Sequence, residues 1–351
     1  MAVSLKPLRN QIIVITGATS GIGLTTARMA ARRGARLVLA ARSEGALIEL
    51  ERELSNGRHR AVTVTADVGK PADVQRISRI ARQMFGGFDT WVNNAGVSMY
   101  GRILDEPIED MRRLFETNFW GLVYGSLEAA RYFKEHDQTG AIINVGSTLS
   151  DRALIRQGMY SASKHAVKAF TDGLRMEVEM DGMPISVTLI QPGAVATPYS
   201  QHAKNYMETE PTNPPPVYAP ETVARTILHC AESSERNVYV GGGGKGIAML
   251  GYYAPRLADL LMETLFANQQ QTDRPPARPR GENALDRPSD NLRERGDYQG
   301  HVSESSLYTT ASLHPMLTGA ALVGAGLALK TLWPSKRNAG PMQNVRRTPQ
   351  R

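Results

Sequence analysis

The stretch Thr16-Gly17-Ala18-Thr19-Ser20-Gly21-Ile22-Gly23 carries the strongest indication of the fold. It lies between an apolar run typical of a buried strand and a pattern typical of a helix. Glycines in such a turn allow the backbone to approach a pyrophosphate closely, and the phosphates then lie at the positive end of the following helix. A glycine-rich stretch alone could be a plain tight turn, so its place in a first strand–helix unit is what indicates a dinucleotide-binding loop.

Short apolar runs alternate with longer helical patterns from residue 11 to about residue 195. This alternation is typical of a parallel sheet, whose strands read as continuous apolar runs because helices cover both faces. We therefore expect one α/β domain over residues 8–266, built on a Rossmann-like, doubly wound parallel sheet. The expected strands are 11–16, 36–40, 61–66, 90–93, 141–145 and 185–191, with 237–240 as a seventh candidate.

The end of the second expected strand reads Ala40-Ala41-Arg42-Ser43 and indicates which dinucleotide binds. A carboxylate at this place would accept hydrogen bonds from the ribose hydroxyls of NAD. This chain has instead Arg42, whose charged fork suits the 2′-phosphate of NADP, and Ser43, which adds a hydroxyl. An exposed arginine after a strand is common, but after a glycine-rich loop it favours NADP(H).

A third cluster consists of Ser147, Tyr160 and Lys164. Tyr160 and Lys164 are four residues apart, so both point from one face of a helix. A free tyrosine has a pKa of about 10, and a nearby ammonium would favour the phenolate and lower that pKa toward a value useful for proton transfer. Ser147 follows the fifth expected strand, where its hydroxyl can hydrogen-bond a substrate carbonyl. The Tyr-x-x-x-Lys spacing alone is common by chance.

Taken in order, these features resemble the classical short-chain dehydrogenase/reductase family over roughly residues 8–200. Two small departures are Gly146, where the family commonly has a second serine, and the bulky Phe119-Trp120 after Asn118; neither removes a catalytic group. The resemblance rests on Thr16–Gly23, Asn93-Asn94-Ala95-Gly96, Asn118, Ser147, Tyr160-x-x-x-Lys164 and Pro192-Gly193.

The resemblance implies hydride transfer between NADPH and a carbonyl or alcohol. It makes Tyr160 the acid–base residue, Ser147 the residue that orients the carbonyl, and Lys164 the ribose-binding partner that lowers the tyrosine pKa. Asn118 would hold a water that connects Lys164 to solvent. A dimer or tetramer through the helices that carry Asn118 and Tyr160 is also implied. The alternative is a non-catalytic NADP-binding or membrane-associated scaffold protein.

The expected cofactor-binding residues combine this resemblance with the Arg42 and Ser43 interpretation. They are Thr16, Gly17, Thr19, Ser20, Gly21, Ile22, Gly23, Arg42, Ser43, Asp67, Val68, Asn94, Ala95, Gly96, Tyr160, Lys164, Pro192, Gly193, Val195 and Thr197.

Three segments follow the expected β-strands of the family core. Residues 197–220 are polar and proline-rich, which is consistent with an irregular loop but favours a substrate lid, because such folds place lids after the carboxyl end of a strand. Apolar residues recur over 246–266 and predict a helix. Residues 267–312 mix prolines with closely spaced charges and almost no large apolar side chains, so we expect a disordered linker.

Residues 313–333 form a small-residue-rich hydrophobic stretch, and 334–351 form a basic tail. A helix over 313–333 would be about 30 Å long, just enough to span a bilayer. Spanning would carry the basic tail away from the cytosol, against the preference of basic residues, whereas lying on an anionic membrane surface avoids that conflict. Membrane attachment, packing on a partner and soluble behaviour all stay open.

The net charge of +7 over 351 residues belongs mainly to the C-terminal end, because removing the six basic residues after Leu329 leaves a body near +1. The rest of the sequence shows no basic face interleaved with aromatic residues, and this argues against nucleic-acid binding. The single cysteine, Cys230, excludes an internal disulfide and a cysteine-based metal site, and we expect no metal. The chain begins without a signal-peptide pattern, so we expect a cytoplasmic protein, attached to the inner face of a membrane if the tail binds lipid. Such attachment and the apolar neighbours of the lid favour a lipophilic substrate.

Overall fold

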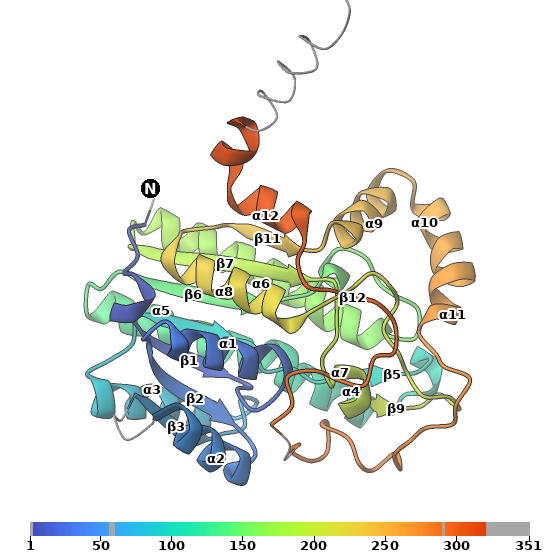
Figure 1. The fold of residues 1–351 in the computed structure, drawn as a ribbon, viewed down its shortest axis with the longest axis horizontal. Coiled ribbons are helices and arrows are strands. Elements are labelled where there is room, and N and C mark those ends of the chain that lie inside the picture. The colour runs from blue at the N-terminus through green and yellow to red at the C-terminus, as the bar shows by residue number, and fades with distance from the viewer. Residues whose placement is uncertain (1–2, 56–59, 290–291, 321–351) are drawn as a thin grey trace, which may run out of the picture. The chain divides into compact units, whose positions relative to one another are not determined.

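The computed structural model describes residues 3–55, 60–289 and 292–320 (Figure 1). The chain divides into two compact units, Met1–Thr309 and Thr310–Arg351. The first unit contains the sheet and every residue of the expected site.

Seven parallel strands form the central sheet in the order β3-β2-β1-β4-β6-β7-β11 (Figure 1). The strand order reverses between β1 and β4, which creates the crevice where open α/β sheets bind ligands. The expected Rossmann-like, doubly wound fold is therefore confirmed, and each expected strand agrees with the structure to within one residue at each end. The strands are β1 (Ile12–Thr16), β2 (Arg36–Ala41), β3 (Ala61–Thr65), β4 (Thr90–Asn93), β6 (Gly140–Val145), β7 (Ile185–Pro192) and β11 (Asn237–Val240).

Helices cover both faces of this sheet. On one face, α3, α5 and α6 bury their apolar sides in a shared core, while α1 and α8 lie side by side on the other face (Figure 1). The helix bounds are α1 (Gly21–Arg32), α2 (Glu44–Ser55), α3 (Pro71–Phe85), α4 (Ile108–Phe115), α5 (Gly121–Glu135), α6 (Gly158–Met180) and α8 (Pro220–Glu232).

The strand β1 shows why continuous apolar runs predicted this architecture. Val14 packs into the core shared by α3, α5 and α6, whereas Ile13 and Ile15 point to the opposite face, and all three are fully buried. Burial of each such side chain contributes about 1.5–3 kcal/mol to stability, so a polar residue on either face would be costly.

Residues 197–220 fold over the carboxyl ends of the strands. They contain α7 (Tyr199–His202), β9 (Lys204–Asn205) and β10 (Val217–Tyr218). Two short pairings hold them: β9 with β5 (Met99–Tyr100), and β10 with β8 (Ala194–Val195). The segment is therefore placed beside the expected site by hydrogen bonds at both of its ends.

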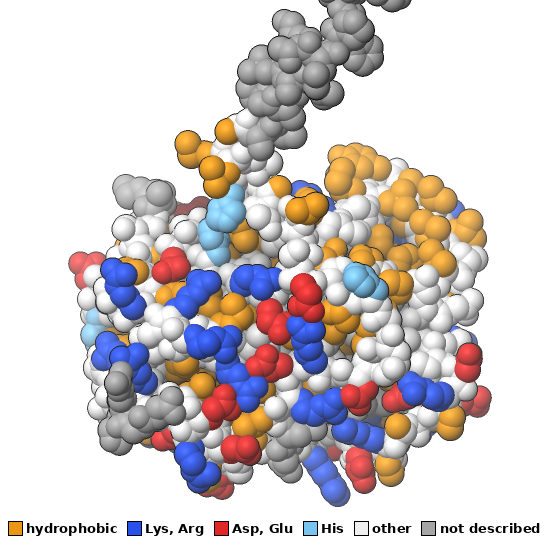
Figure 2. All heavy atoms as spheres, in the orientation of Figure 1, with side chains coloured by type: hydrophobic (Ala, Val, Ile, Leu, Met, Phe, Trp, Pro, Cys, Tyr) orange, Lys and Arg blue, Asp and Glu red, His pale blue; other side chains and the backbone are white. Residues whose placement is uncertain are grey.

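The apolar stretch expected as one helix over 246–266 is divided in the structure. It forms α9 (Gly242–Tyr253), then α10 (Pro255–Leu261), then a π-helical turn, Met262–Phe266, and α11 (Ala267–Gln269). Pro255 separates α9 from α10, because proline has no N–H for the helix ladder and is accommodated at a first helical position. Both helices carry exposed apolar side chains, which form an orange patch over α9 and α10 in Figure 2.

The structure differs from the expectation of a disordered linker over residues 267–312. Of this segment, residues 267–289 and 292–309 belong to the first unit, and β12 (Val302–Ser303) pairs in parallel with β10. Residues that come much earlier in the chain supply its partners, as in the ion pairs of Arg295 with Glu221 and of Glu294 with Arg28. The segment has few large apolar side chains of its own, but it packs against the rest of the first unit. The compact unit thus extends beyond residue 266, the expected end of the domain.

The second unit is described only as far as residue 320. Of the expected hydrophobic helix 313–333, residues 321–333 lie outside the described residues, as does the whole basic tail 334–351. Within the part of the chain that the structure describes, no helix combines the length and the apolar character needed to cross a membrane.

Candidate active site

Two adjoining cavities lie at the carboxyl ends of the central strands. The glycine-loop cavity is lined by residues 17 and 19–22 and by the ends of β2, β3 and β4. The tyrosine cavity is lined by Ser147, Tyr160 and Lys164. The residues common to both are Ile22, Asn94, Gly96, Thr197 and Tyr199. The two cavities therefore form one continuous site.

The loop between β1 and α1 requires glycine where chain segments meet closely. Gly17 has a φ of +67°, and a Cβ on Gly23 would lie only 2.1 Å from the carbonyl oxygen of Gly17. The Asn94 side-chain amide donates to the carbonyls of Thr16 and Gly17 at 3.0 and 3.2 Å. The hydroxyl of Thr16 in turn accepts the backbone N–H of Asn94 at 3.1 Å. This cradle at the start of a helix fits a pyrophosphate.

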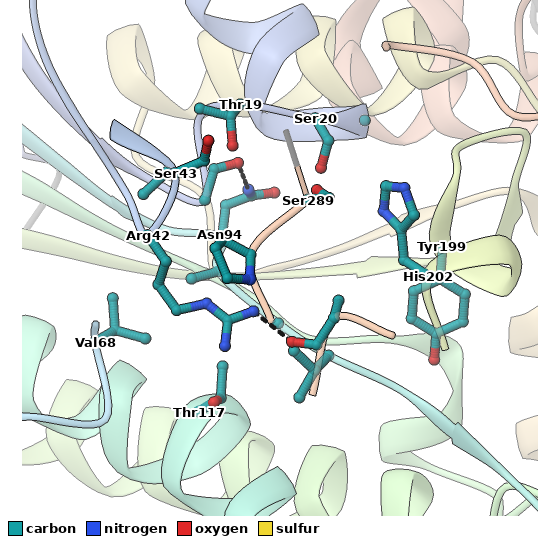
Figure 3. A pocket seen from close by; sticks show the side chains of 18 of the residues that line it. Thr19, Ser20, Arg42, Ser43, Val68, Asn94, Thr117, Tyr199, His202 and Ser289 are labelled. Atoms are coloured by element: carbon teal, nitrogen blue, oxygen red, sulfur yellow. Dashed lines mark hydrogen bonds between the residues drawn. The ribbon is translucent and has the colours of Figure 1, made fainter. Parts of the chain in front are cut away.

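Arg42, Ser43, Asp67 and Val68 all line the glycine-loop cavity. Figure 3 shows Arg42 and Val68 on the side of the cavity opposite Tyr199 and His202. The guanidinium of Arg42 donates to the backbone carbonyl of Ala284. Burial lowers the pKa of Arg42, and the charge of Asp67 acts in the opposite direction. Arg42 thus faces the cavity as a cation whose described hydrogen-bond acceptors are neutral carbonyls.

Ser147, Tyr160 and Lys164 meet in the tyrosine cavity although two different elements carry them. Ser147 follows β6 and caps the short helix Thr148–Ser150, where its Oγ accepts the N–H of Leu149 at 3.1 Å. Tyr160 and Lys164 lie one turn apart on α6, with the Lys164 Nζ 5.7 Å from the centre of the Tyr160 ring. That Nζ donates to the carbonyl of Val145 at 2.9 Å. The packing of α6 on the end of β6 therefore brings the three groups together.

Asn118 is fully buried in a π-helical turn, Glu116–Trp120, next to this cluster. Its side chain accepts the N–H of Val97 at 2.8 Å and donates to the Val97 carbonyl at 3.0 Å. It also donates to the hydroxyl of Ser163 at 3.3 Å. Asn118 therefore joins the loop after β4 to α6, and π-helical turns of this kind are frequent at functional sites.

Burial dominates the electrostatics of the tyrosine cavity. It raises the pKa of Tyr160, and hydrogen bonding to Tyr199 and Ser147 only partly opposes this. Burial lowers the pKa of Lys164 to about 8. The ammonium of Lys164 is predicted to favour the phenolate; burial acts in the opposite direction on the Tyr160 pKa and outweighs the hydrogen bonds, so the shift is upward.

Most of the expected site residues line one of the two cavities. Thr16, Gly23 and Asn118 do not; they hold the backbone around the cavities through the contacts given above. The glycine-loop cavity contains Gly17, Thr19, Ser20, Gly21, Ile22, Arg42, Ser43, Asp67, Val68, Asn94, Ala95, Gly96 and Thr197. The tyrosine cavity adds Ser147, Tyr160, Lys164, Pro192, Gly193 and Val195.

Two further sets of lining residues are not marked by any pattern in the sequence. Tyr100, Gln157 and Tyr199 line the tyrosine cavity, where the rings of Tyr199 and Tyr160 meet edge-on at 5.5 Å between centres. Pro198-Tyr199 does follow Thr197 directly, but no spacing marked it. Ala284 and Ser289 line the glycine-loop cavity from more than 240 positions beyond Arg42, and no local pattern can reveal such a contact.

Comparison with known proteins agrees with this geometry. A family model described as short chain dehydrogenase matches residues 11–208. The chain is 47% identical over 323 residues to the uncharacterized oxidoreductase YxnA of Bacillus subtilis, covering 92% of this chain and 90% of that protein. It is 36% identical over 247 residues to 11-beta-hydroxysteroid dehydrogenase A of Sesamum indicum, covering 66% of this chain and 69% of that protein.

A solved structure supports the same assignment. The crystal structure of a short-chain type dehydrogenase/reductase from Mycobacterium marinum superposes with a TM-score of 0.59 at 26% identity, covering 71% of this chain and 98% of that one. Proteins of this family are oxidoreductases that bind a nicotinamide cofactor and act on CH–OH groups of small molecules. The family match spans the glycine loop, the Arg42 region and the Ser147, Tyr160 and Lys164 cluster. The chain belongs to the classical short-chain dehydrogenase/reductase family.

Proposed function

We propose that this protein interconverts a carbonyl and an alcohol on a lipophilic small molecule with NADP(H), and that Tyr160 is its acid–base residue. The observation that carries the proposal is the meeting of Ser147, Tyr160 and Lys164 in a cavity continuous with the glycine loop. A substrate carbonyl can lie between the two hydroxyls there while a dinucleotide occupies the adjoining cavity.

In the reductive direction, Tyr160 donates its phenolic proton to the carbonyl oxygen while the carbonyl carbon gains a hydride. When bound in the adjoining cavity, a nicotinamide would supply that hydride in reduction and accept one in oxidation. Ser147 donates a hydrogen bond that holds the carbonyl oxygen and stabilises its developing negative charge. Lys164, whose pKa of about 8 keeps it mostly protonated at neutral pH, stabilises the phenolate left on Tyr160. Asn118 joins α6 to the loop after β4 and so positions the water through which the proton is replaced.

NADP rather than NAD is favoured by the residues at the end of β2. Arg42 faces the glycine-loop cavity, and Ser43 stands beside it where a carboxylate would otherwise accept from the ribose. A guanidinium binds a 2′-phosphate with two charge-assisted hydrogen bonds. Because cytosolic NADP is held mostly reduced, we propose carbonyl reduction as the direction in the cell.

A lipophilic substrate is favoured by the lining of the tyrosine cavity. Apart from the catalytic group, its wall includes Leu149, Leu154, Tyr100, Tyr199 and Val195. An apolar wall with a few convergent polar groups is typical of sites for apolar ligands. The relative from Sesamum indicum is named for a hydroxysteroid, which is in keeping with a substrate of this kind.

We also propose membrane association for the C-terminal part of the chain. The hydrophobic stretch 313–333 and the basic tail 334–351 together supply an apolar and an electrostatic attachment, the two signals that stable surface binding requires. The exposed apolar patch in Figure 2 adds surface of the same kind; its residues are Met249, Tyr252, Tyr253, Leu257, Leu260 and Leu265.

Replacement of Tyr160 with phenylalanine tests the mechanism. With NADPH and a panel of steroid, retinoid and fatty-aldehyde carbonyls, the wild type oxidises NADPH, and Tyr160→Phe loses about 100-fold or more in kcat because no acid remains to protonate the oxygen. Its dissociation constant for NADPH changes little. Tyr252→Phe, an exposed tyrosine of α9, is the matched control and keeps full turnover.

Two results would contradict the proposal. Turnover in Tyr160→Phe equal to that of the wild type would show that Tyr160 is not the acid. Tight NADPH binding by the wild type without turnover of any carbonyl would favour the alternative, a non-catalytic NADP-binding protein.

A further inference from the structure

A strap formed by residues 282–289 and 292–297 runs along the glycine-loop cavity. Near its start, Ala284 donates its N–H to the carbonyl of His202 at 2.7 Å and accepts from the guanidinium of Arg42. Ala284, Pro288 and Ser289 line the cavity itself. Figure 3 shows Ser289 between Ser20 and His202, across the cavity from Val68. The strap is therefore part of the wall of the expected cofactor site.

Asp286 anchors the first half of the strap to the domain. Its carboxylate forms ion pairs with Arg113 and with Lys204, the latter at 3.0 Å. It also accepts from the side-chain amide of Asn283 at 2.9 Å, which closes a local turn. Burial acts to raise the pKa of Asp286, but the hydrogen bond from Asn283 and the charges of Lys204 and Arg113 outweigh it and lower the pKa, so the anchor is charged at neutral pH. Loss of this one charge would release the strap near Arg42 without touching a cavity-lining side chain.

The second half of the strap is anchored on α1. The carbonyl of Arg293 accepts the N–H of Gly21, the first residue of the helix, at 2.9 Å. Glu294 pairs with Arg28 at 2.7 Å. Gly296 lies so close to Thr197 that a Cβ on it would be 2.5 Å from the Thr197 carbonyl oxygen. The strap thus contacts both the glycine loop and the segment that follows β7.

A buried histidine faces this cavity beside the strap. His202 lines the cavity, and its Nε2 is buried without a hydrogen-bond partner among the described residues. Burial and the charges of Arg278 and Arg293 lower the pKa of His202 to about 4, so the imidazole is neutral at pH 7. This neutral imidazole therefore has a ring nitrogen available to a ligand bound in the cavity.

We propose that the strap is a binding element of the cofactor site. The strap encloses the bound dinucleotide and competes with it for the guanidinium of Arg42. The Ala284 carbonyl holds Arg42 until the 2′-phosphate of the cofactor takes its place. Because Pro288 and Ser289 form part of the wall, the dinucleotide enters and leaves only when the strap shifts. The identity of the cofactor in this inference rests on the proposed function, whereas the enclosure of the cavity by the strap does not depend on it.

The strap makes cofactor exchange slow in both directions, and anchor variants test this. Stopped-flow measurement of protein-bound NADPH fluorescence gives the association and dissociation rate constants for the full-length chain. We expect both constants to rise by about fivefold or more in Asp286→Asn, since a partly buried ion-pair network is removed. Glu294→Gln, which loosens the other half through Arg28, changes them in the same direction. Asp181→Asn, which breaks the exposed pair with Lys134 at 3.2 Å, is the matched control and leaves both unchanged.

Trypsin cleavage after Arg293 and Arg295 reports the strap directly. We expect NADPH to slow cleavage at these two sites in the wild type and Asp286→Asn to accelerate it. Faster cleavage in both anchor variants with unchanged rate constants would overturn the inference, because the strap would then be loose without effect on the cofactor. Unchanged cleavage upon addition of saturating NADPH would overturn it as well.

The same measurements separate this inference from the proposed function. If the chain binds NADH and not NADPH, the choice of NADP is wrong, but the rate constants measured with NADH still test the strap. If the wild type binds neither dinucleotide, both the proposed function and the inference about the strap are wrong.

Discussion

Replacing Arg42 with alanine tests which dinucleotide the protein uses. The guanidinium faces the glycine-loop cavity and donates to the carbonyl of Ala284. We expect the substitution to weaken NADPH binding strongly and NADH binding very little, because only NADPH carries the phosphate that Arg42 can bind.

The magnitude follows from an exchange of hydrogen bonds. A charge-assisted pair between Arg42 and a phosphate contributes about 1.5–3 kcal/mol, whereas its present bond to the neutral Ala284 carbonyl contributes about 1 kcal/mol. The net loss is therefore about 0.5–2 kcal/mol, which corresponds to roughly a 2- to 30-fold rise in the Kd for NADPH. NADH binds without displacing a phosphate contact, and its Kd should stay within about twofold.

The assay is a fluorescence titration of each variant with NADPH and with NADH. Arg36→Ala is the matched control, because Arg36 lies on the same strand, β2, at the opposite end, and its side chain covers the ring of Phe85. That variant should keep the affinities of the wild type for both dinucleotides.

Equal losses for NADPH and NADH in Arg42→Ala would refute the reasoning. They would mean that Arg42 supports the cavity wall through Ala284 rather than reading the 2′-phosphate. An unchanged Kd for both dinucleotides would show that Arg42 takes no part in binding.

Two further predictions concern stability and membrane binding. Burial raises the pKa of Glu106 to about 7 from 4.5, and neither carboxylate oxygen has a partner among the described residues. Because the folded state binds this proton more tightly than the unfolded state, the free energy of unfolding falls as pH rises from about 4.5 to 7. Glu106→Gln should therefore raise the free energy of unfolding by about 1–2 kcal/mol at pH 8 and not at pH 5. An equal gain at both pH values would contradict this cause. In flotation with anionic vesicles, the full chain should rise with the lipid and a chain ending at residue 320 should not; full-length protein that stays at the bottom would end the membrane proposal.

The strands could be predicted closely because burial on both faces of the sheet demands continuous apolar runs. The run that became β1 illustrates this, since Ile13 and Val14 serve opposite faces of the sheet. The glycine loop could be predicted equally well, because the close approach of Gly23 to the Gly17 carbonyl leaves no room for a side chain at position 23. The alternation of strand and helix likewise predicted a doubly wound sheet, because parallel strands need helical crossovers that cover both faces.

The segment 267–312 could not be predicted, because composition reports only what a segment can bury by itself. Asp286 obtains its charge partners from Arg113 and Lys204, and Glu294 from Arg28, all distant in sequence. The single helix predicted over 246–266 is wrong at Pro255, where α10 begins. The apolar periodicity continues past this proline and so does not show that the helix is interrupted there.

By itself, the sequence determined the Rossmann-like sheet, the glycine loop and the pairing of Tyr160 with Lys164, because these depend on backbone sterics, apolar periodicity and helical spacing. Only the tertiary structure decided the direction of the Tyr160 pKa shift, since that depends on how completely the phenol is removed from water. It alone placed Tyr199 against Tyr160 and the Ala284 carbonyl against Arg42. Such contacts join residues brought together by folding, and no local pattern encodes them.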